Sequence, residues 1–153
     1  ALMRSKGFSE KDFAVFHPGG KLGKKLSHVT DYMRPITSNH TLLVNSSLHD
    51  ALKAVTADNF GIAPVVDACG YLIGSVTDGD LRRFLLKNET TALSSRVKDF
   101  MSQKPKFIKE TLLAIDAVEL MNKSAITSLF VVDESQHPQA ILRMHDLLAA
   151  KVV

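Results

Sequence analysis

Apolar residues recur along this chain with a helical period in some segments and as short continuous runs in others. Residues 48–57 have the helical period, with Leu48, Ala51, Leu52 and Val55 on one face and Ser47 before them as the expected N-cap. A β-branched run, turn residues, a second apolar run and another amphipathic segment follow. They predict a strand at Ile62–Val66, a turn at Asp67–Gly70, a strand at Tyr71–Val76 and a helix at Asp78–Leu86.

The same order of elements occurs twice. Val29-Thr30-Asp31-Tyr32-Met33 returns as Val97-Lys98-Asp99-Phe100-Met101, and Pro64-Val65-Val66-Asp67 returns as Phe130-Val131-Val132-Asp133. The second copy is predicted to contain a helix at 112–122, strands at 128–132 and 139–142, and a helix at 144–150. With short extended segments at 42–44 and 106–108, each unit has the order β-α-β-β-α. A unit of about 60 residues leaves one sheet face poorly covered, so we expect two copies packed sheet to sheet in an α+β fold.

Composition and charge narrow the classes of function. The chain has 153 residues, 45% of them hydrophobic, and a single cysteine, Cys69, which cannot form an internal disulfide. No apolar run reaches the roughly 18 residues of a membrane span, and no signal peptide is evident, so a cytoplasmic location without membrane partners is expected. The net charge of +3 is concentrated in residues 1–28, which argues against nucleic-acid binding. Because the first residue is not methionine, the chain is expected to be part of a longer polypeptide.

Three motifs carry a resemblance to a known family. The duplicated Asp-aromatic-Met opening, the Pro-Val-Val-Asp strand and the Gly-x-x-Thr-x-x-Asp pattern at residues 74–80 resemble a tandem pair of CBS domains, the Bateman module. The stretch Gly7 to Leu26 resembles the junction in D-arabinose 5-phosphate isomerases of the KdsD/GutQ (KpsF) type, where a sugar isomerase (SIS) domain precedes the pair. The resemblance implies a short helical SIS remnant and linker at 1–28, a CBS domain at 29–90 and another at 91–153, the two related by a pseudo-two-fold axis.

The glycine- and lysine-rich stretch from His17 to Lys25 does not fit a phosphate-binding P-loop. Three residues rather than four separate Gly19 from Gly23, and Lys25 stands where a metal-binding hydroxyl is required. The resemblance instead assigns His17 to the isomerase active site, where aldose-ketose interconversion needs a general acid or base and no cofactor. The other catalytic groups are expected upstream of this chain, so His17 is expected to be inert here.

The predicted strand-to-helix junction at Thr77 and Asp80 has two interpretations. By spacing alone, Thr77 is an N-cap and Asp80 the third helical residue, a capping box that needs no ligand. The same junction presents backbone N–H groups and the positive end of the helix dipole, which favour a phosphate group. The resemblance supports the second interpretation, because Thr-x-x-Asp in CBS pairs is the ribose-phosphate grip. It places the base near Ile36, Thr37, Gly61, Ile62 and Ala63.

The second repeat departs from this pattern. It keeps the aspartate as Asp146 but has Arg143 in place of the threonine. Arg143 could clamp a phosphate or carboxylate, or it could pair with Asp146 and fill a site that binds nothing. The remaining residues of this second site would be Ser128, matched with Thr127 to Ala63 and Ile62, together with Phe107 and Ile108. We expect the better-formed site in the first repeat.

These patterns lead to one expected function and one alternative. The histidines have no paired metal-ligand spacing, and Asp78 with Asp80 is a weak pattern for calcium or magnesium, so no metal is expected. The resemblance implies a regulatory CBS pair attached to an SIS domain. We expect it to bind AMP, ATP, CMP or a CMP-linked sugar, as a homodimer within a tetrameric parent. The alternative is an oligomerisation module with vestigial pockets.

Overall fold

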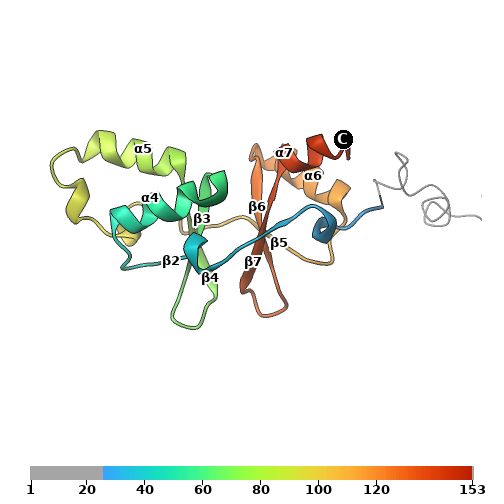
Figure 1. Ribbon diagram of the computed structural model, residues 1–153, viewed down its shortest axis with the longest axis horizontal. Coiled ribbons are helices and arrows are strands. Elements are labelled where there is room, and N and C mark those ends of the chain that lie inside the picture. The colour runs from blue at the N-terminus through green and yellow to red at the C-terminus, as the bar shows by residue number, and fades with distance from the viewer. Residues whose placement is uncertain (1–25, 153) are drawn as a thin grey trace, which may run out of the picture. The chain divides into compact units, whose positions relative to one another are not determined.

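The computed structural model describes residues 26–152 (Figure 1). The first repeat contains η1 (Val29–Asp31), β1 (Arg34–Pro35), η2 (Ser38–His40), β2 (Leu42–Leu43), α4 (Leu48–Thr56), η3 (Ala57–Asn59), β3 (Ile62–Val66), β4 (Leu72–Thr77), α5 (Asp78–Lys87) and η4 (Ala92–Ser94). The second contains η5 (Val97–Asp99), β5 (Phe107–Lys109), α6 (Ala114–Ser124), β6 (Ser128–Val132), β7 (Pro138–Arg143) and α7 (Met144–Ala149). The α+β class and the duplicated β-α-β-β-α order are confirmed.

The described strands form two sheets. In the first, the strand order is β2-β3-β4, with β2 parallel to β3 and β3 antiparallel to β4. Ile62 at the start of β3 lies opposite Thr77 at the end of β4. In the second sheet the order is β1-β7-β6-β5. The sequence did not predict β1, a two-residue edge strand from the first repeat that joins the sheet of the second.

The opening segment of each repeat is hydrogen-bonded to the other repeat. The Val29 N–H donates to the Leu112 carbonyl (3.0 Å), just ahead of α6, and the Val97 N–H donates to the Ser46 carbonyl (2.9 Å), just ahead of α4. Both valines are fully buried. Each opening segment therefore pairs with the residues that lead into the first helix of the other repeat. Accordingly, the described residues form two compact units, one of residues 26–34, 108–129 and 142–152, the other of residues 35–107 and 130–141.

The helices α4 and α5 share one hydrophobic core with the first sheet. The buried residues of α4 are Leu48, Ala51, Ala54 and Val55, and they pack with Leu81 of α5 and with residues of all three strands. Leu52 was predicted on the buried face, but it is 39% exposed because it lies at the rim of the apolar stripe. Ser47 forms the expected N-cap, since its hydroxyl accepts the Asp50 N–H (3.0 Å).

Both hairpins turn in the same way. Asp67 Oδ1 accepts the N–H groups of Cys69 and Tyr71, and Asp133 Oδ1 accepts those of Ser135 and His137. The backbone N–H of His137 is the main cause that lowers the pKa of Asp133. Because Asp side chains form such Asx-type turns, the sequence could predict the positions of both turns.

The Ser47 cap gives the first prediction. Replacing Ser47 with alanine removes the acceptor for one helix N–H, and we expect it to lower the free energy of unfolding by about 1 kcal/mol. Urea denaturation followed by circular dichroism measures this change. Ser135→Ala, at an exposed turn position, is the matched control and should leave the unfolding midpoint unchanged. An equal effect of both substitutions would contradict a specific role for the cap.

Candidate functional site

The residues Thr77 and Asp80 form a complete capping box at the start of α5. Thr77 Oγ1 accepts the Asp80 N–H (3.1 Å), and Asp80 Oδ2 accepts the Thr77 N–H (3.0 Å). The second oxygen of Asp80, Oδ1, accepts a hydrogen bond from Arg83 Nη2 (2.9 Å). Arg83 is 70% exposed and can move away without uncovering the core. The carboxylate therefore has one oxygen held by the cap and one held by a replaceable surface side chain.

Two of the predicted base-pocket residues lie beside this junction. The Gly61 carbonyl accepts the Asp78 N–H (3.1 Å), and Ile62 is the sheet partner of Thr77. Gly61 has φ +75°, and a Cβ on it would lie 3.2 Å from Asp78 Oδ2. Another residue at this position would strain the backbone, and its Cβ would require a small shift of the Asp78 carboxylate.

The other predicted pocket residues have more varied surroundings. Ala63 is fully buried in the core between the sheet and the helices, so its side chain acts in packing. Ile36 packs with Ile62 against one buried cluster, and its N–H donates to the Gln139 carbonyl (3.0 Å). Thr37 precedes η2 as its N-cap. Ile36 and Ile62 thus pack against the same buried cluster, and Ile62 is also the sheet partner of Thr77.

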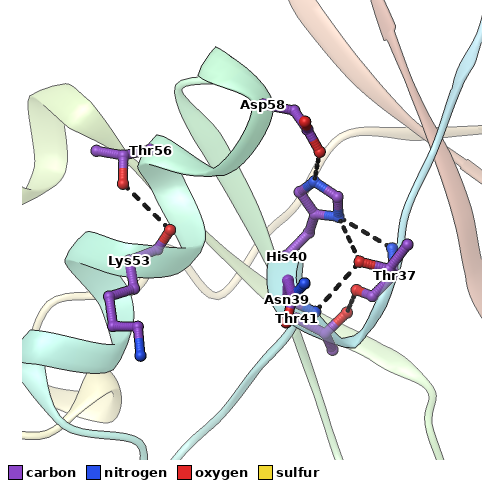
Figure 2. A network of polar contacts seen from close by, with 7 residues as sticks. All are labelled: Thr37, Asn39, His40, Thr41, Lys53, Thr56 and Asp58. Carbon is purple, nitrogen blue, oxygen red and sulfur yellow. Dashed lines mark hydrogen bonds and ion pairs between the residues drawn. The ribbon is translucent and has the colours of Figure 1, made fainter.

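A buried histidine that sequence reasoning passed over lies between these segments (Figure 2). His40 is 2% exposed, and its Nδ1 accepts the Thr37 N–H (2.9 Å). Its Nε2 lies 2.7 Å from Asp58 Oδ2, and its ring stacks on Phe60 with centroids 4.7 Å apart. The available signal was the capping-box spacing of Thr37 and His40, with histidine in place of the usual Glu or Gln.

In the second repeat, the corresponding junction is occupied by arginine. Arg143 Nε and Nη2 donate to the two carboxylate oxygens of Asp146 (2.8 and 3.1 Å), and Arg34 Nη2 donates to Asp146 Oδ1 (3.2 Å). Burial by itself would raise the pKa of Asp146, but the hydrogen bonds and charges of Arg143 and Arg34 outweigh it and lower that pKa below its ordinary value. Arg143 therefore pairs with Asp146 in this structure.

The match between the two sites shifts by one residue from the expected one. The Met144 N–H donates to the Thr127 carbonyl (2.8 Å), as the Asp78 N–H does to the Gly61 carbonyl. Thr127 therefore corresponds to Gly61, and Ser128, the first residue of β6, corresponds to Ile62 rather than to Ala63. The alignment of Pro64–Asp67 with Phe130–Asp133 already has this offset, so the error lay in the matching of Thr127 and Ser128 alone. In β5, Phe107 is partly exposed and Ile108 is buried.

Several further features bear on the site. His17 lies outside the described residues. Among residues 26–152, no group of three or more His, Cys, Asp or Glu side chains could hold a metal ion. In the same part of the chain, every helix is too short or too polar to cross a bilayer.

A surface hollow of about 290 Å³ lies between η2, β2 and α4, and none of the predicted ligand residues line it.

The CBS domain family model matches residues 29–87 and 97–153. The chain therefore belongs to the CBS domain family and contains two copies of the domain, as the duplicated motifs predicted.

The chain is also similar to curated isomerases. It is 36% identical over 154 residues to arabinose 5-phosphate isomerase KdsD of Yersinia pestis and 39% identical over 155 residues to the same enzyme of Escherichia coli K12. Each match covers 100% of this chain but 46% of the relative. The chain thus spans about half the length of these isomerases, and the resemblance to them expected from the sequence is confirmed.

Among solved structures, the fold is similar to that of CBSX2 in complex with AMP. The TM-score is 0.68 at 25% sequence identity, and the match covers 82% of this chain and 96% of CBSX2. That protein binds an adenine nucleotide, so its ligand belongs to the general class expected here.

The arginine-paired Asp146 gives a prediction about pH. Because the folded-state pKa is lowered below the ordinary value of 3.8, the carboxylate contributes stability that is present at neutral pH. This contribution is lost as the pH falls below the ordinary value and through the lowered folded-state value. The difference in unfolding free energy between the wild type and Asp146→Asn should therefore shrink as the pH is lowered from about 6 to about 2.5.

Urea denaturation at a series of pH values measures this difference. Glu134→Gln, at an exposed hairpin position, is the control and should differ little from the wild type throughout. A constant difference between the wild type and Asp146→Asn across the series would show that the arginine pairing does not stabilise the fold through its charge.

Proposed function

We propose that this chain is the nucleotide-sensing part of a D-arabinose 5-phosphate isomerase, with its ligand site in the first repeat. The parent would interconvert D-ribulose 5-phosphate and D-arabinose 5-phosphate in the cytoplasm, on the route to 3-deoxy-D-manno-octulosonate and lipopolysaccharide. His17 would belong to the active site of the attached SIS domain. Support comes from the similarity to the KdsD isomerases and from the CBS pair itself.

One observation carries the proposal, namely the state of the Asp80 carboxylate. Among residues 26–152, its Oδ1 accepts a hydrogen bond from the exposed guanidinium of Arg83 alone, while its Oδ2 stays in the capping box. A ribose diol could replace Arg83 at Oδ1 without opening the cap. The released guanidinium would then be free to pair with the nucleotide phosphate, which also faces the N-terminus of α5.

The pairing of Asp146 in the second repeat supports a single nucleotide site in each chain. Asp146 is 10% exposed and accepts hydrogen bonds from both Arg143 and Arg34. A ribose diol would have to displace two arginines from a largely buried carboxylate, which leaves charges unpaired. We therefore place the ligand on Thr77 and Asp80 and treat Phe107, Ile108 and Ser128 as the remains of a second site.

The ligand class follows from the chemistry of the junction and from the relatives. A diol-binding carboxylate beside a helix N-terminus fits a ribonucleotide. AMP and ATP are favoured by the similarity to the AMP-bound CBSX2, while CMP or a CMP-linked sugar would report the end product of the proposed pathway. Ligand binding would change the relative stability of two arrangements of the assembled parent and so alter its activity.

A second candidate function is oligomerisation with vestigial pockets. It is favoured by the fact that the aspartate of each junction is already hydrogen-bonded without a ligand. This candidate predicts no response to any nucleotide, together with a smaller assembly when the CBS pair is removed from the parent. Size-exclusion chromatography with light scattering on the parent, with and without the pair, measures the second property.

The site assignment is tested with two matched aspartate variants. Asp80→Asn keeps an acceptor for the cap but removes the charge that would hold the diol, and we expect it to weaken nucleotide binding by tenfold or more. Asp146→Asn, the equivalent change in the second repeat, should leave affinity within about twofold of the wild type. Isothermal calorimetry with AMP, ATP, CMP and the CMP-linked sugar gives these affinities.

The outcomes separate the candidates. Binding by the wild type that is lost in Asp80→Asn alone supports the proposal. Binding that is lost in Asp146→Asn alone moves the site to the second repeat. An absence of heat with all four compounds, together with unchanged melting temperatures, contradicts the sensor and leaves the oligomerisation module.

A further inference from the structure

We infer that His40 is a positioning residue, which holds together two segments that flank the nucleotide pocket of the first repeat. This inference rests on the proposed function and goes beyond it, because His40 belongs to neither the phosphate nor the ribose grip. The two segments are residues 36–37, ahead of η2, and residues 58–62, which lead into β3.

The first segment is held through a backbone hydrogen bond. The Thr37 N–H donates to His40 Nδ1 (2.9 Å), and the Thr37 hydroxyl lies 3.1 Å from the same nitrogen (Figure 2). Since Nδ1 accepts a backbone N–H, the ring proton lies on the other nitrogen. The Thr41 hydroxyl also donates to the Thr37 carbonyl (3.0 Å), so the backbone of Thr37 is hydrogen-bonded at both its N–H and its carbonyl.

The second segment is held through the other side of the ring. His40 Nε2 carries the proton and donates to Asp58 Oδ2 (2.7 Å), while the ring face stacks on Phe60. Asp58, Asn59 and Gly61 all have positive φ values, of 52°, 58° and 75°. Asp and Asn adopt left-handed conformations more often than other residues with a Cβ, but the conformation still costs free energy that surrounding contacts must offset. His40 supplies such support directly at Asp58.

The position of this turn decides where two pocket residues lie. Gly61 follows the turn, accepts the Asp78 N–H at the start of α5, and is succeeded by Ile62, the sheet partner of Thr77. Ile36 and Ile62 pack against the same buried cluster. The His40 side chain therefore links Thr37, the residue after Ile36, to the turn that precedes Gly61. Loss of either hydrogen bond would let one segment move relative to the ribose grip.

Histidine is suited to this role because one ring both accepts and donates. Asparagine at position 40 retains an acceptor near the Nδ1 position but does not reach Asp58. Glutamine reaches Asp58 but does not present its acceptor to Thr37. Phenylalanine fills the space and can stack on Phe60, but it forms neither hydrogen bond. The three substitutions therefore separate the two hydrogen bonds from simple packing.

The test measures, by calorimetry, the affinity for each of AMP, ATP, CMP and the CMP-linked sugar that the wild type binds, at a temperature well below the melting temperature of each variant. We expect His40→Phe to weaken binding by about tenfold and His40→Asn and His40→Gln by smaller factors, with no change in stoichiometry. His49→Asn, on the exposed face of α4, is the control and should match the wild type. A purely structural histidine would lower the melting temperatures but leave the affinities of the folded variants unchanged.

Asp58 provides a second test that does not depend on a buried substitution, because its side chain is 71% exposed. Asp58→Asn keeps an acceptor for His40 and should bind within about twofold of the wild type, whereas Asp58→Ala should weaken binding about as much as His40→Asn. The double variant His40→Asn/Asp58→Ala should lose no more than either single variant, because both remove the same hydrogen bond.

The results distinguish this inference from the proposed function. If the wild type binds none of AMP, ATP, CMP and the CMP-linked sugar, the proposed function fails and this inference fails with it. If the wild type binds and both Asp58→Ala and His40→Phe bind equally well, the inference alone is overturned. Additive losses in the double variant would also overturn it, because they would show that His40 and Asp58 act separately.

Discussion

The N-terminus of α5 imposes the constraint on which the rest of this account depends. A helix cannot satisfy its first N–H groups by itself, and Thr77 with Asp80 supplies the missing partners here. The side chains that complete the fold at this junction are the same ones that would hold a ribonucleotide. Stability and binding are compatible only because a carboxylate has two oxygens, and the cap uses one while an exposed arginine uses the other.

The second repeat resolves the same constraint differently. Arg143 replaces the threonine, so α7 has no side-chain cap, and Asp146 is directed to two arginines instead. One of these, Arg34, comes from β1 of the first repeat. The hydrogen bonding of each opening segment to the other repeat therefore has a chemical consequence, because it brings a residue of one repeat to the aspartate of the other. Duplication gave two similar junctions, and this arginine pair makes them unequal.

Local patterns predicted most elements but not the contacts between distant segments. Ile62–Val66 was predicted at its observed bounds because a β-branched run flanked by turn residues is a local signal. The helix predicted from residue 112 begins at Ala114 because Leu113 is extended, with ψ 145°, to pair with the opening segment of the other repeat. The spacing of Thr77 and Asp80 predicted the capping box, and the resemblance to CBS pairs assigned them to a ligand. His40 was not, because its partner Asp58 is 18 residues away and its burial depends on the tertiary fold.

The central claim is that one repeat binds a nucleotide and the other does not. Equilibrium dialysis with a radiolabelled nucleotide, at concentrations well above the dissociation constant measured for it, tests this most directly. The account predicts saturation at one nucleotide per chain, because Asp80 can release an exposed arginine while Asp146 is held by two. Saturation at two nucleotides per chain, or no saturable binding, would contradict it.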